Sequence, residues 1–323
     1  MPPLVTVGLP VRNGENFLVS ALDSLLGQDF GDFELLLSDN GSDDGTEEIC
    51  RKYAEHDSRV HYLRSAFNRG AHWNFNRLVA EANGRYFKWA AHDDVCLPSF
   101  LGRCVEVLQG APDSVVLCYP RTVLINETGQ VIDDDFFDGL DRREPSPHER
   151  IRHYASHTGE NHAVFGLIRT DGLRRTQLLR NCWGGDIGLM AELLLLGQFW
   201  ELEDRLFLRR YHPGISHSVG RTFSEVAAWF DPAKAGRNAF PRNRLLWEVM
   251  STIARAPLSR DERSRCAVAV MTQWLPTHGR AMGGELKVAY RRSVRPRLQE
   301  ITGRSGIRRT TGVPAASHPR RHQ

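Results

Sequence analysis

The first 120 residues alternate short apolar runs with amphipathic segments, and this alternation restricts the possible folds more than any other feature. Near-continuous apolar runs typical of buried strands lie at 4–9, 33–38, 60–63, 86–91 and 115–119. The segments at 15–28, 45–56, 71–82 and 97–109 show the apolar spacing of helices. Strands of this kind joined through helices predict an α/β fold, with a Rossmann-like, mostly parallel sheet covered by helices on both faces.

After residue 120 the pattern changes. Residues 121–132 predict a hairpin turning at Asn126-Glu127-Thr128-Gly129, and the acidic, Pro-rich stretch 133–147 predicts a surface loop. Residues 163–169 and 199–211 are strand-like, and an apolar helix is expected to begin at Asp186. From residue 223 to about 294 we expect helices separated by prolines, namely Pro232, Pro241, Pro257 and Pro276.

Composition is that of a globular protein, with 41% hydrophobic and 25% charged residues in 323. No apolar run approaches the ~20 residues that a membrane-spanning helix needs, and no N-terminal leader pattern is visible. The six cysteines lack Cys-x-x-Cys spacing, which favours reduced, buried thiols over zinc ligands or disulfides. These features predict a cytoplasmic protein.

Basic residues are concentrated at the end of the chain. From Glu285 onward there are ten Lys and Arg against two Glu, a balance of +8 in a chain whose net charge is +3. Residues 301–323 have low hydrophobicity and predict a disordered tail. Such a tail can lie against anionic lipid at the inner face of a membrane, or it can be a solvated end. The charge distribution does not predict a nucleic-acid partner.

Two of the predicted strands end in acidic residues. One is followed by Asp39-Asn40-Gly41-Ser42-Asp43-Asp44, and the other by His92-Asp93-Asp94. The carboxyl ends of neighbouring parallel strands meet at one edge of a sheet, where ligands bind in open α/β folds. Carboxylate oxygens are the ligands that Mg²⁺ and similar hard cations prefer. The two acidic ends therefore indicate a nucleotide–metal site.

A series of motifs in a fixed order carries a family resemblance. They are residues 5–15, Gln28 with residues 33–43, Asn68-Arg69-Gly70 with Asn76, Gly84-Arg85-Tyr86-Phe87, and His92-Asp93-Asp94 with Pro98. Together they resemble the family-2 inverting glycosyltransferases of the GT-A fold, over roughly residues 4–215. The resemblance implies a GT-A domain at 1–220, with a nucleotide-binding half (1–120) and an acceptor half (121–220). A helical extension (221–300) and the basic tail follow.

The resemblance implies a nucleotide pocket built from the first loop and from the acid after the second strand. Pro10, Asn13 and Glu15 would line it, and Asp39 would accept a hydrogen bond from the base. Further nucleotide contacts are expected from Asn68, Asn76, His92 and Arg210. Taken alone, the residues after position 39 also fit a turn before a helix.

The family's metal motif, Asp-x-Asp, is incomplete in this chain. Its first position falls on Ala91, its middle on His92 and its second acid on Asp93. The resemblance implies Mg²⁺ or Mn²⁺ held by Asp93 and the donor's diphosphate. Asp94 either assists or caps the following helix, and His92 contacts phosphate or is a bystander.

Two downstream segments complete the expected site. Trp183-Gly184-Gly185-Asp186 is similar to the family's Glu-Asp segment, which implies Asp186 as the general base, although the same residue fits a helix N-cap. Residues 209–216 resemble the segment Tyr-Arg-x-His-Pro-Gly-Ser, which maps Arg210 to diphosphate and His212 to the metal. For His212 a turn beside Pro213-Gly214 is the alternative.

These residues predict an inverting, metal-dependent transferase of the hexosyltransferase type. It would move a sugar from a nucleoside diphosphate sugar to a hydroxyl of a glycan, lipid-linked or small-molecule acceptor, in bacterial-type surface glycan or glycoconjugate assembly. The alternative is a GT-A scaffold without catalysis that only binds a nucleotide or glycan, which Ala91 favours.

Overall fold

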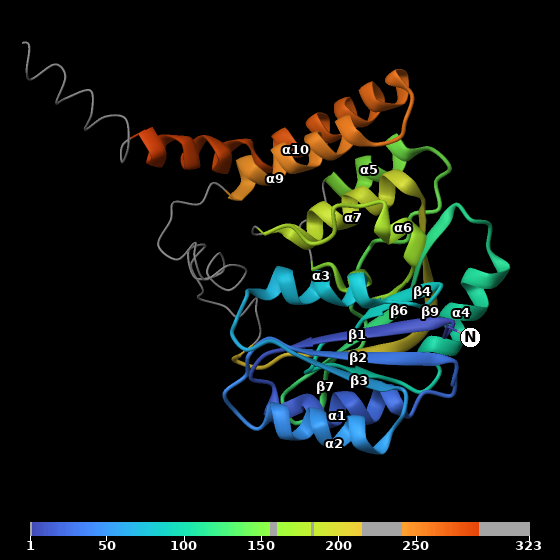
Figure 1. Cartoon of the computed structure of the whole chain (residues 1–323). Helices are drawn as coiled ribbons and strands as arrows, with labels where there is room; N and C mark the ends of the chain where they lie inside the picture. Colours follow the sequence, from blue (N-terminus) through green and yellow to red (C-terminus); the bar gives the residue numbers. More distant parts are fainter. Residues whose placement is uncertain (1, 156–159, 182–183, 215–240, 291–323) are drawn as a thin grey trace, which may run out of the picture.

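A computed structural model of the chain describes residues 2–155, 160–181, 184–214 and 241–290. The predicted boundaries near residues 220 and 300, the basic tail at 301–323 and Pro232 lie outside these described residues. Figure 1 shows an α/β body with two long C-terminal helices lying across its top.

One mixed sheet of nine strands forms the centre of the described chain, in the order β3-β2-β1-β4-β8-β6-β9-β5, with β7 beside β6. Strands β1, β2, β3 and β4 are mutually parallel, whereas β8 runs antiparallel to both of its neighbours. The strands are β1 (Val5–Val11), β2 (Phe33–Asp39), β3 (Val60–Arg64), β4 (Tyr86–Trp89), β5 (Val95–Cys96), β6 (Val115–Ile125), β7 (Val131–Asp133), β8 (Leu167–Arg169) and β9 (Gln198–Arg210).

Helices cover both faces of this sheet (Figure 1). On one face lie α1 (Glu15–Leu26), α2 (Thr46–His56) and α4 (Phe100–Gly110). On the other lie α3 (Ala71–Glu81), α5 (Pro147–Ala155), the 3₁₀ helix η1 (His162–Phe165), α6 (Thr170–Arg174), α7 (Gly185–Leu196), α9 (Pro241–Arg255) and α10 (Arg260–Ala289). The predicted GT-A architecture, with a C-terminal helical addition, is confirmed.

The two faces hold separate hydrophobic clusters because neighbouring strand residues point in opposite directions. Tyr86 belongs to the cluster with α1 and α4, while Phe87 belongs to the cluster with α3 and α7. Leu35 and Leu36 divide in the same way. Burial on both faces explains why the strands appear as nearly continuous apolar runs in the sequence.

Three local expectations differ from the structure. The stretch 133–147 is not a simple surface loop, because Asp138 and Leu140 are buried and Arg142 forms a β-bridge with Phe199. Residues 162–165 form η1, so only 167–169 of the predicted strand are extended. Pro276 lies inside α10 without ending it.

Pro276 is exposed, and this explains why the helix tolerates it. A proline removes one backbone hydrogen bond, and on an exposed face water can satisfy the carbonyl that is left without a partner.

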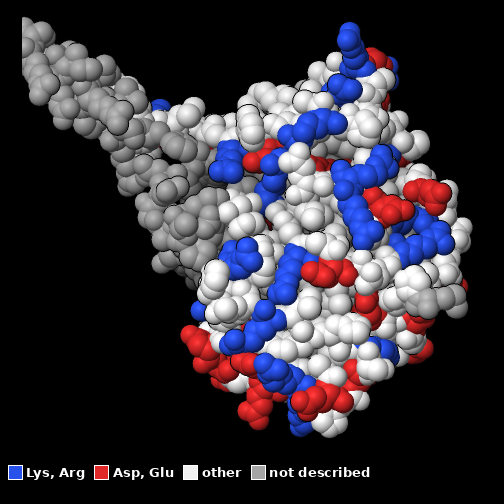
Figure 2. Space-filling view, in the orientation of Figure 1, with Lys and Arg blue, Asp and Glu red and all other residues white. Residues whose placement is uncertain are grey.

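On the face drawn in Figure 2, positive and negative side chains are interspersed over the described surface and do not separate into areas of one sign. This mixture is the ordinary pattern of a protein surface.

Gly8 in β1 provides a test of the packing between the sheet and α3. A Cβ atom at Gly8 would lie 2.9 Å from the Phe87 ring and 3.0 Å from Leu78 Cβ. Gly8→Ala should therefore destabilise the protein by about 1–3 kcal/mol in urea unfolding. Gly279→Ala is the matched control: its Cβ meets nothing within 4 Å inside α10, so stability should rise by about 0.5–1 kcal/mol. Equal effects of the two changes would contradict this packing.

Candidate active site

The parallel strands bring the predicted nucleotide residues to one edge of the sheet. Val11 at the end of β1 pairs with Asp39 at the end of β2, and β4 on the other side of β1 leads directly into His92 and Asp93. Pro10 is buried in β1, one residue before this edge. The shared strand direction, predicted from the sequence, produces this convergence.

The loop after β1 is bonded to the loop after β2. Asn13 Nδ2 donates to Asp43 Oδ1 (2.7 Å), and the Asn13 backbone N–H donates to Ser42 Oγ (3.0 Å). Glu15 Oε2 accepts from the Gly45 N–H (2.7 Å). The polar groups of Asn13 and Glu15 thus already stabilise the two loops against each other, and this fixes the shape of the edge.

His92 packs on the loop after β1. A Cβ atom at Gly14 would lie 2.6 Å from His92 Cδ2, so only glycine allows this approach. The imidazole is partly exposed, and its Nδ1 lies 4.0 Å from Asp93 Oδ1. His92 therefore lies between the first loop and Asp93.

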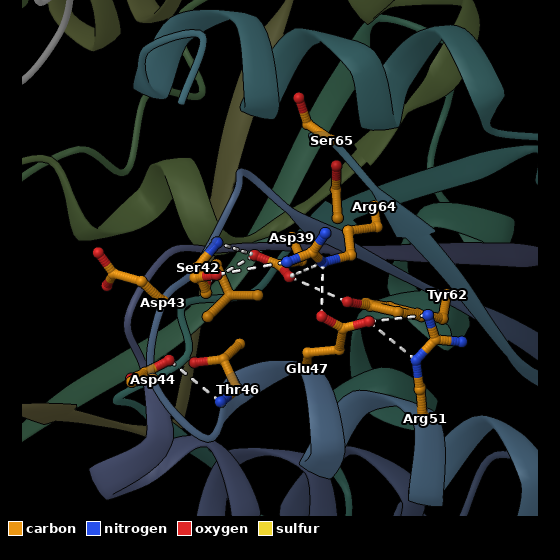
Figure 3. A network of polar contacts seen from close by, with 12 residues as sticks. Asp39, Ser42, Asp43, Asp44, Thr46, Glu47, Arg51, Tyr62, Arg64 and Ser65 are labelled. Carbon is orange, nitrogen blue, oxygen red and sulfur yellow. Dashed lines mark hydrogen bonds and ion pairs between the residues drawn. The ribbon is translucent and has the colours of Figure 1, made fainter. Parts of the chain in front are cut away.

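Asp39 is enclosed by four hydrogen-bond or ion-pair donors (Figure 3). Its Oδ1 accepts from the Ser42 N–H (2.9 Å) and hydroxyl (2.6 Å). Its Oδ2 accepts from the Tyr62 hydroxyl (2.9 Å) and lies 3.4 Å from Arg64 Nε. The side chain is 0% exposed. Asp39 therefore stabilises the turn after β2, which is the alternative that the following residues allowed. Both of its oxygens are occupied, so neither is an open acceptor for a base.

Asn68 and Asn76 also have internal partners. Asn68 Oδ1 accepts from Asn40 Nδ2 (3.0 Å) and from the Gly70 N–H (2.9 Å), joining the end of β2 to the start of α3. The amide of Asn76 both donates to and accepts from the backbone of Leu179 (2.9 and 3.0 Å). Asn68 thus borders the strand edge, whereas the Asn76 amide connects α3 to the segment before α7.

Asp93 faces His212 across the edge of the sheet. His212 Nε2 lies 3.0 Å from Asp93 Oδ2, and its Nδ1 accepts from the Gly214 N–H (3.2 Å). Because Nδ1 accepts, Nε2 carries the proton in the neutral imidazole and donates to Asp93. Burial acts to raise the pKa of Asp93, but the hydrogen bond from His212 and the charges of His92 and Arg209 outweigh it and lower this pKa. His212 therefore serves both the turn and the acidic corner.

Asp94 forms a buried ion pair, and it does not cap a helix. Its Oδ2 accepts from Arg209 Nη1 (2.7 Å) and its Oδ1 from the Arg210 N–H (2.9 Å). The cap interpretation is wrong because α4 begins only at Phe100. With both oxygens bonded and the residue 4% exposed, Asp94 ties the acidic loop to β9 and does not face a ligand.

Arg210 is likewise turned inward. Its Nε donates to the Asp93 carbonyl (2.8 Å), and its Nη1 donates to the carbonyls of Asn126 and Glu127 (3.2 Å each). The guanidinium lies over the ring of Phe17, 5.0 Å from its centroid. Arg210 thus fixes the backbone that carries Asp93, and its Nε and Nη1 are occupied by backbone carbonyls.

Asp186 lies in the first turn of α7, partly exposed. The N-cap of this helix is Gly184, so the cap interpretation of Asp186 is wrong. Asn161 Nδ2 lies 3.4 Å from Asp186 Oδ2, and the Tyr154 hydroxyl donates to Asn161 Oδ1 (3.3 Å). The carboxylate therefore retains acceptor capacity at the helix start.

Gly185 replaces the acidic residue of the family pattern for a steric reason. A Cβ atom there would lie 2.4 Å from the Arg180 carbonyl oxygen. The close approach of α7 to the preceding segment leaves no space for a side chain at this position.

A buried polar cluster that the sequence did not predict lies beside these residues. Glu160 Oε2 bonds to His162 Nε2 (2.8 Å), and this bond, with one to Tyr211, lowers the pKa of Glu160 to about 2. His162 Nδ1 lies 3.9 Å from Asp138 Oδ1. Asn161 contacts Asp186, and Glu160 bonds to Tyr211, the residue before His212. Residues 160–162 therefore connect the start of α7 to the corner formed by Asp93 and His212. Glu160 belongs to none of the family motifs, so the sequence offered no signal for it. Arg209 could have been found, because it lies next to Arg210, which the resemblance did predict.

Asp93 and His212 are the candidate ligands for the metal that the family resemblance implies. Within the described ranges, no three or more His, Cys, Asp and Glu side chains form a metal-binding group. One carboxylate and one imidazole do lie within 3.0 Å of each other. Two protein ligands suit a Mg²⁺ or Mn²⁺ ion that takes its other ligands from a diphosphate and water.

The mixed sheet, with helices on both faces and acidic residues at the carboxyl edge, is the architecture of the GT-A fold. The sequence profile of Glycosyl transferase family 2 matches residues 6–176, more than half of the chain. The chain therefore belongs to this family.

Individual relatives match a shorter part of the chain. It is 32% identical over 125 residues to the uncharacterized glycosyltransferase RP339 of Rickettsia prowazekii, covering 39% of this chain and 38% of that protein. It is 32% identical over 108 residues to the putative glycosyltransferase EpsE of Bacillus subtilis, covering 33% of this chain and 39% of that protein. The matches thus span less than half of either relative.

Solved structures share the fold at low sequence identity. TarS of S. aureus in complex with UDP-GlcNAc has a TM-score of 0.63 at 15% identity, covering 85% of this chain and 73% of that chain. The mannosyltransferase PcManGT from Pyrobaculum calidifontis, in complex with GDP-Man and Mn²⁺, has a TM-score of 0.52 at 17% identity, covering 94% and 80%.

Asp138 should make stability depend on pH. Burial raises its pKa to about 6, against opposition from His162, and its Oδ2 has no hydrogen-bond partner among the described residues. The folded state therefore holds this proton more tightly than the unfolded state. Stability should fall by about 1 kcal/mol between pH 5 and pH 8 through this group.

Asp138→Asn removes this titration, so its stability relative to wild type should be greater at pH 8 than at pH 5 in thermal unfolding. Asp135→Asn, at a 95% exposed carboxylate in the same segment, should show no such difference. An Asp138→Asn effect that is equal at both pH values would refute the assignment.

Proposed function

We propose that the protein is an inverting glycosyltransferase that moves a sugar from a nucleoside diphosphate sugar to an acceptor hydroxyl. We assign it to bacterial-type surface glycan or glycoconjugate assembly. The observation that carries the proposal is the pairing of Asp93 with His212 at the carboxyl edge of the sheet. Family membership and neighbours solved with UDP-GlcNAc or GDP-Man support a nucleotide-sugar donor.

In this proposal the donor nucleotide occupies the strand edge formed by Pro10, Asn13, Glu15, Asp39 and Asn68. His92, which packs on Gly14 of the loop after β1, would face the phosphates. Asn76 and Arg210 contribute by fixing the surrounding backbone, since their polar groups are bonded to it.

Asp93 and His212 would hold the cation, Mg²⁺ or Mn²⁺. When bound, the cation neutralises the charge that develops on the departing diphosphate. An imidazole in the donor set favours Mn²⁺ over Mg²⁺, because Mg²⁺ takes oxygen ligands. To bind it, His212 must present an unprotonated Nε2, so the proton has to move from the face toward Asp93 to Nδ1.

Asp186 would act as the general base. Its carboxylate accepts the proton of the acceptor hydroxyl as that oxygen attacks the anomeric carbon, on the side opposite the diphosphate. Asn161 keeps the carboxylate oriented by contact with Oδ2, which leaves the other oxygen for the acceptor.

The acceptor, which we take to be a glycan, a lipid-linked sugar or a small molecule, would approach from the side of α7. No helix among the described residues is long and apolar enough to cross a bilayer. Contact of the basic tail with a membrane surface, at the cytoplasmic side, remains part of the proposal.

A GT-A scaffold that binds a nucleotide or glycan without catalysis is the second candidate. Ala91 favours it, because the first acid of the metal motif is absent. Binding of a donor without any turnover by wild-type protein would identify this candidate.

Asp186→Asn should lower the turnover of the donor by about 10²–10⁴-fold and leave the donor Kd nearly unchanged, because the amide cannot accept a proton. A thermal-shift screen of nucleotide sugars first identifies the donor. Its hydrolysis then measures the turnover rate, and calorimetry measures the donor Kd. Asp171→Asn, at an exposed acid in the first turn of α6, is the control and should keep wild-type rates. Full turnover by the Asp186 variant would remove the assignment.

Mn²⁺ should tighten the binding of nucleoside diphosphates by about tenfold or more in calorimetry. Asp93→Asn should abolish that gain, because the amide is a weaker ligand, and chelation with EDTA should have the same effect on wild type. Wild-type affinity that is equal with Mn²⁺ and with EDTA would count against a metal at this position.

A further inference from the structure

A pocket of about 350 Å³ lies at the amino edge of the sheet, away from the candidate active site. Ser114 and Gln198 line it where β6 and β9 begin. These two strands run parallel to each other and, across the antiparallel β8, parallel to β4. Because β9 leads from this pocket to Arg210 beside Asp93, the pocket and the corner of Asp93 and His212 lie at opposite edges of the sheet.

The lining of this pocket has an apolar part and a cationic part. The apolar residues come from α5, from the end of α7 and from the segments before α5 and α10, and they are Pro145, Pro147, Leu195, Leu196, Pro257 and Leu258. The cationic residues are Arg150 of α5 and Arg175, directly after α6. The described residues that line the pocket include no Asp or Glu. The pocket therefore suits a ligand that combines negative charge with an apolar group.

Arg150 is only 4% exposed, and its partners are backbone carbonyls. Its Nε donates to the Leu194 carbonyl at the end of α7 (2.8 Å), and its Nη1 donates to the carbonyls of Glu144 and Pro145 (2.8 Å each). Within the described ranges its Nη2 has no hydrogen-bond partner, and no carboxylate lies within ion-pair distance of the guanidinium. Arg150 is thus held rigidly, with one donor nitrogen unused.

The charge of Arg150 lacks a close counter-charge. Burial acts to lower the pKa of Arg150, and the charge of Glu144 opposes that effect only from beyond ion-pair distance. The Glu144 carboxylate does not line the pocket, and its Oε1 lies 3.7 Å from His153 Nε2. A buried cation is costly unless it is paired. An anion in the pocket would supply both the missing charge and an acceptor for Nη2.

Two further donors at the pocket are available to a ligand. Arg175 is exposed, and its guanidinium forms no hydrogen bond or ion pair with any residue that the structure describes. The hydroxyl of Ser114 is likewise without a partner in the described part of the chain. Neither group has to break a bond within the described structure in order to bind an anion.

We propose that this pocket binds a small organic phosphate, with the phosphate at Arg150 and Arg175 and the organic group against the prolines and leucines. Two guanidinium groups match a phosphate monoester, which carries close to two negative charges at pH 7 and accepts paired N–H bonds. A carboxylate brings only one charge. The pocket volume is at the lower end of the range for small-molecule sites, so the organic group is about the size of one ring.

Calorimetry with the full chain tests the proposal with three probes: phenyl phosphate, inorganic phosphate and benzoate. Phenyl phosphate should bind about tenfold or more tightly than inorganic phosphate, because its ring leaves water for the apolar part of the pocket. It should also bind more tightly than benzoate, which has the same ring and half the charge. Equal affinity for phenyl phosphate and either of the other probes would overturn the assignment of an organic phosphate.

Arg175→Gln locates the binding site. The change should weaken the binding of phenyl phosphate by about tenfold, because one charged hydrogen-bond donor is lost. Since the Arg175 side chain has no partner in the described structure, the variant should keep the wild-type thermal unfolding temperature. Arg152→Gln is the matched control, because it removes the same charge from an exposed position of α5 that does not line the pocket, and it should keep the wild-type Kd.

Three results would overturn the location of the site. They are a wild-type protein that does not bind phenyl phosphate at millimolar concentration, an Arg175→Gln variant that binds it as tightly as wild type, and an Arg152→Gln variant that is weakened as much as Arg175→Gln. None of them bears on the proposed glycosyl transfer, which takes place at the opposite edge of the sheet.

Discussion

The buried ion pair between Asp94 and Arg209 is the contact on which the rest of the site depends. It joins the loop after β4 to the end of β9, two segments 115 residues apart in the sequence. Burying two charges is costly unless each is well bonded, and here Asp94 also accepts from the Arg210 backbone. The pair places Asp93 opposite His212, because these residues are the immediate neighbours of the segments that it connects.

Around this pair, the loops of the strand edge are bonded to each other and require no ligand to hold their shape. Asn13, Glu15 and Asn68 each use polar groups to bond a neighbouring loop, while Asp39 bonds its own turn and Tyr62 of β3. Such an edge is preorganised, so that under the proposed function little conformational entropy has to be lost on binding of a nucleotide. It also means that several polar groups that a motif alone would assign to a ligand are already bonded within the protein.

This difference shows which parts of the site can be predicted from the sequence and which cannot. Apolar alternation predicts the sheet and its two helical layers, and parallel strands place Asp39 and Asp93 at one edge. The sequence cannot tell which oxygen is already bonded, because Arg64 and Arg209 reach their partners through tertiary packing. The two neighbouring arginines of β9 illustrate the limit: one neutralises Asp94, while the other binds backbone carbonyls. Only the alternate direction of strand side chains, in three dimensions, separates their roles.

The same reasoning gives a physical meaning to Ala91, the main departure from the family pattern. Asp93 and Asp94 are both buried, and Arg209 is the guanidinium that neutralises them within the described structure. A third carboxylate at position 91 would add repulsion to a corner with one strong positive partner, and would raise the pKa values of its neighbours. Alanine avoids this repulsion, and Asp93, whose pKa is lowered, stays ionised beside His212. Under the proposed function, the shortened motif therefore favours a site in which the His212 imidazole replaces part of the acidic ligand set, and it preserves the charge on Asp93.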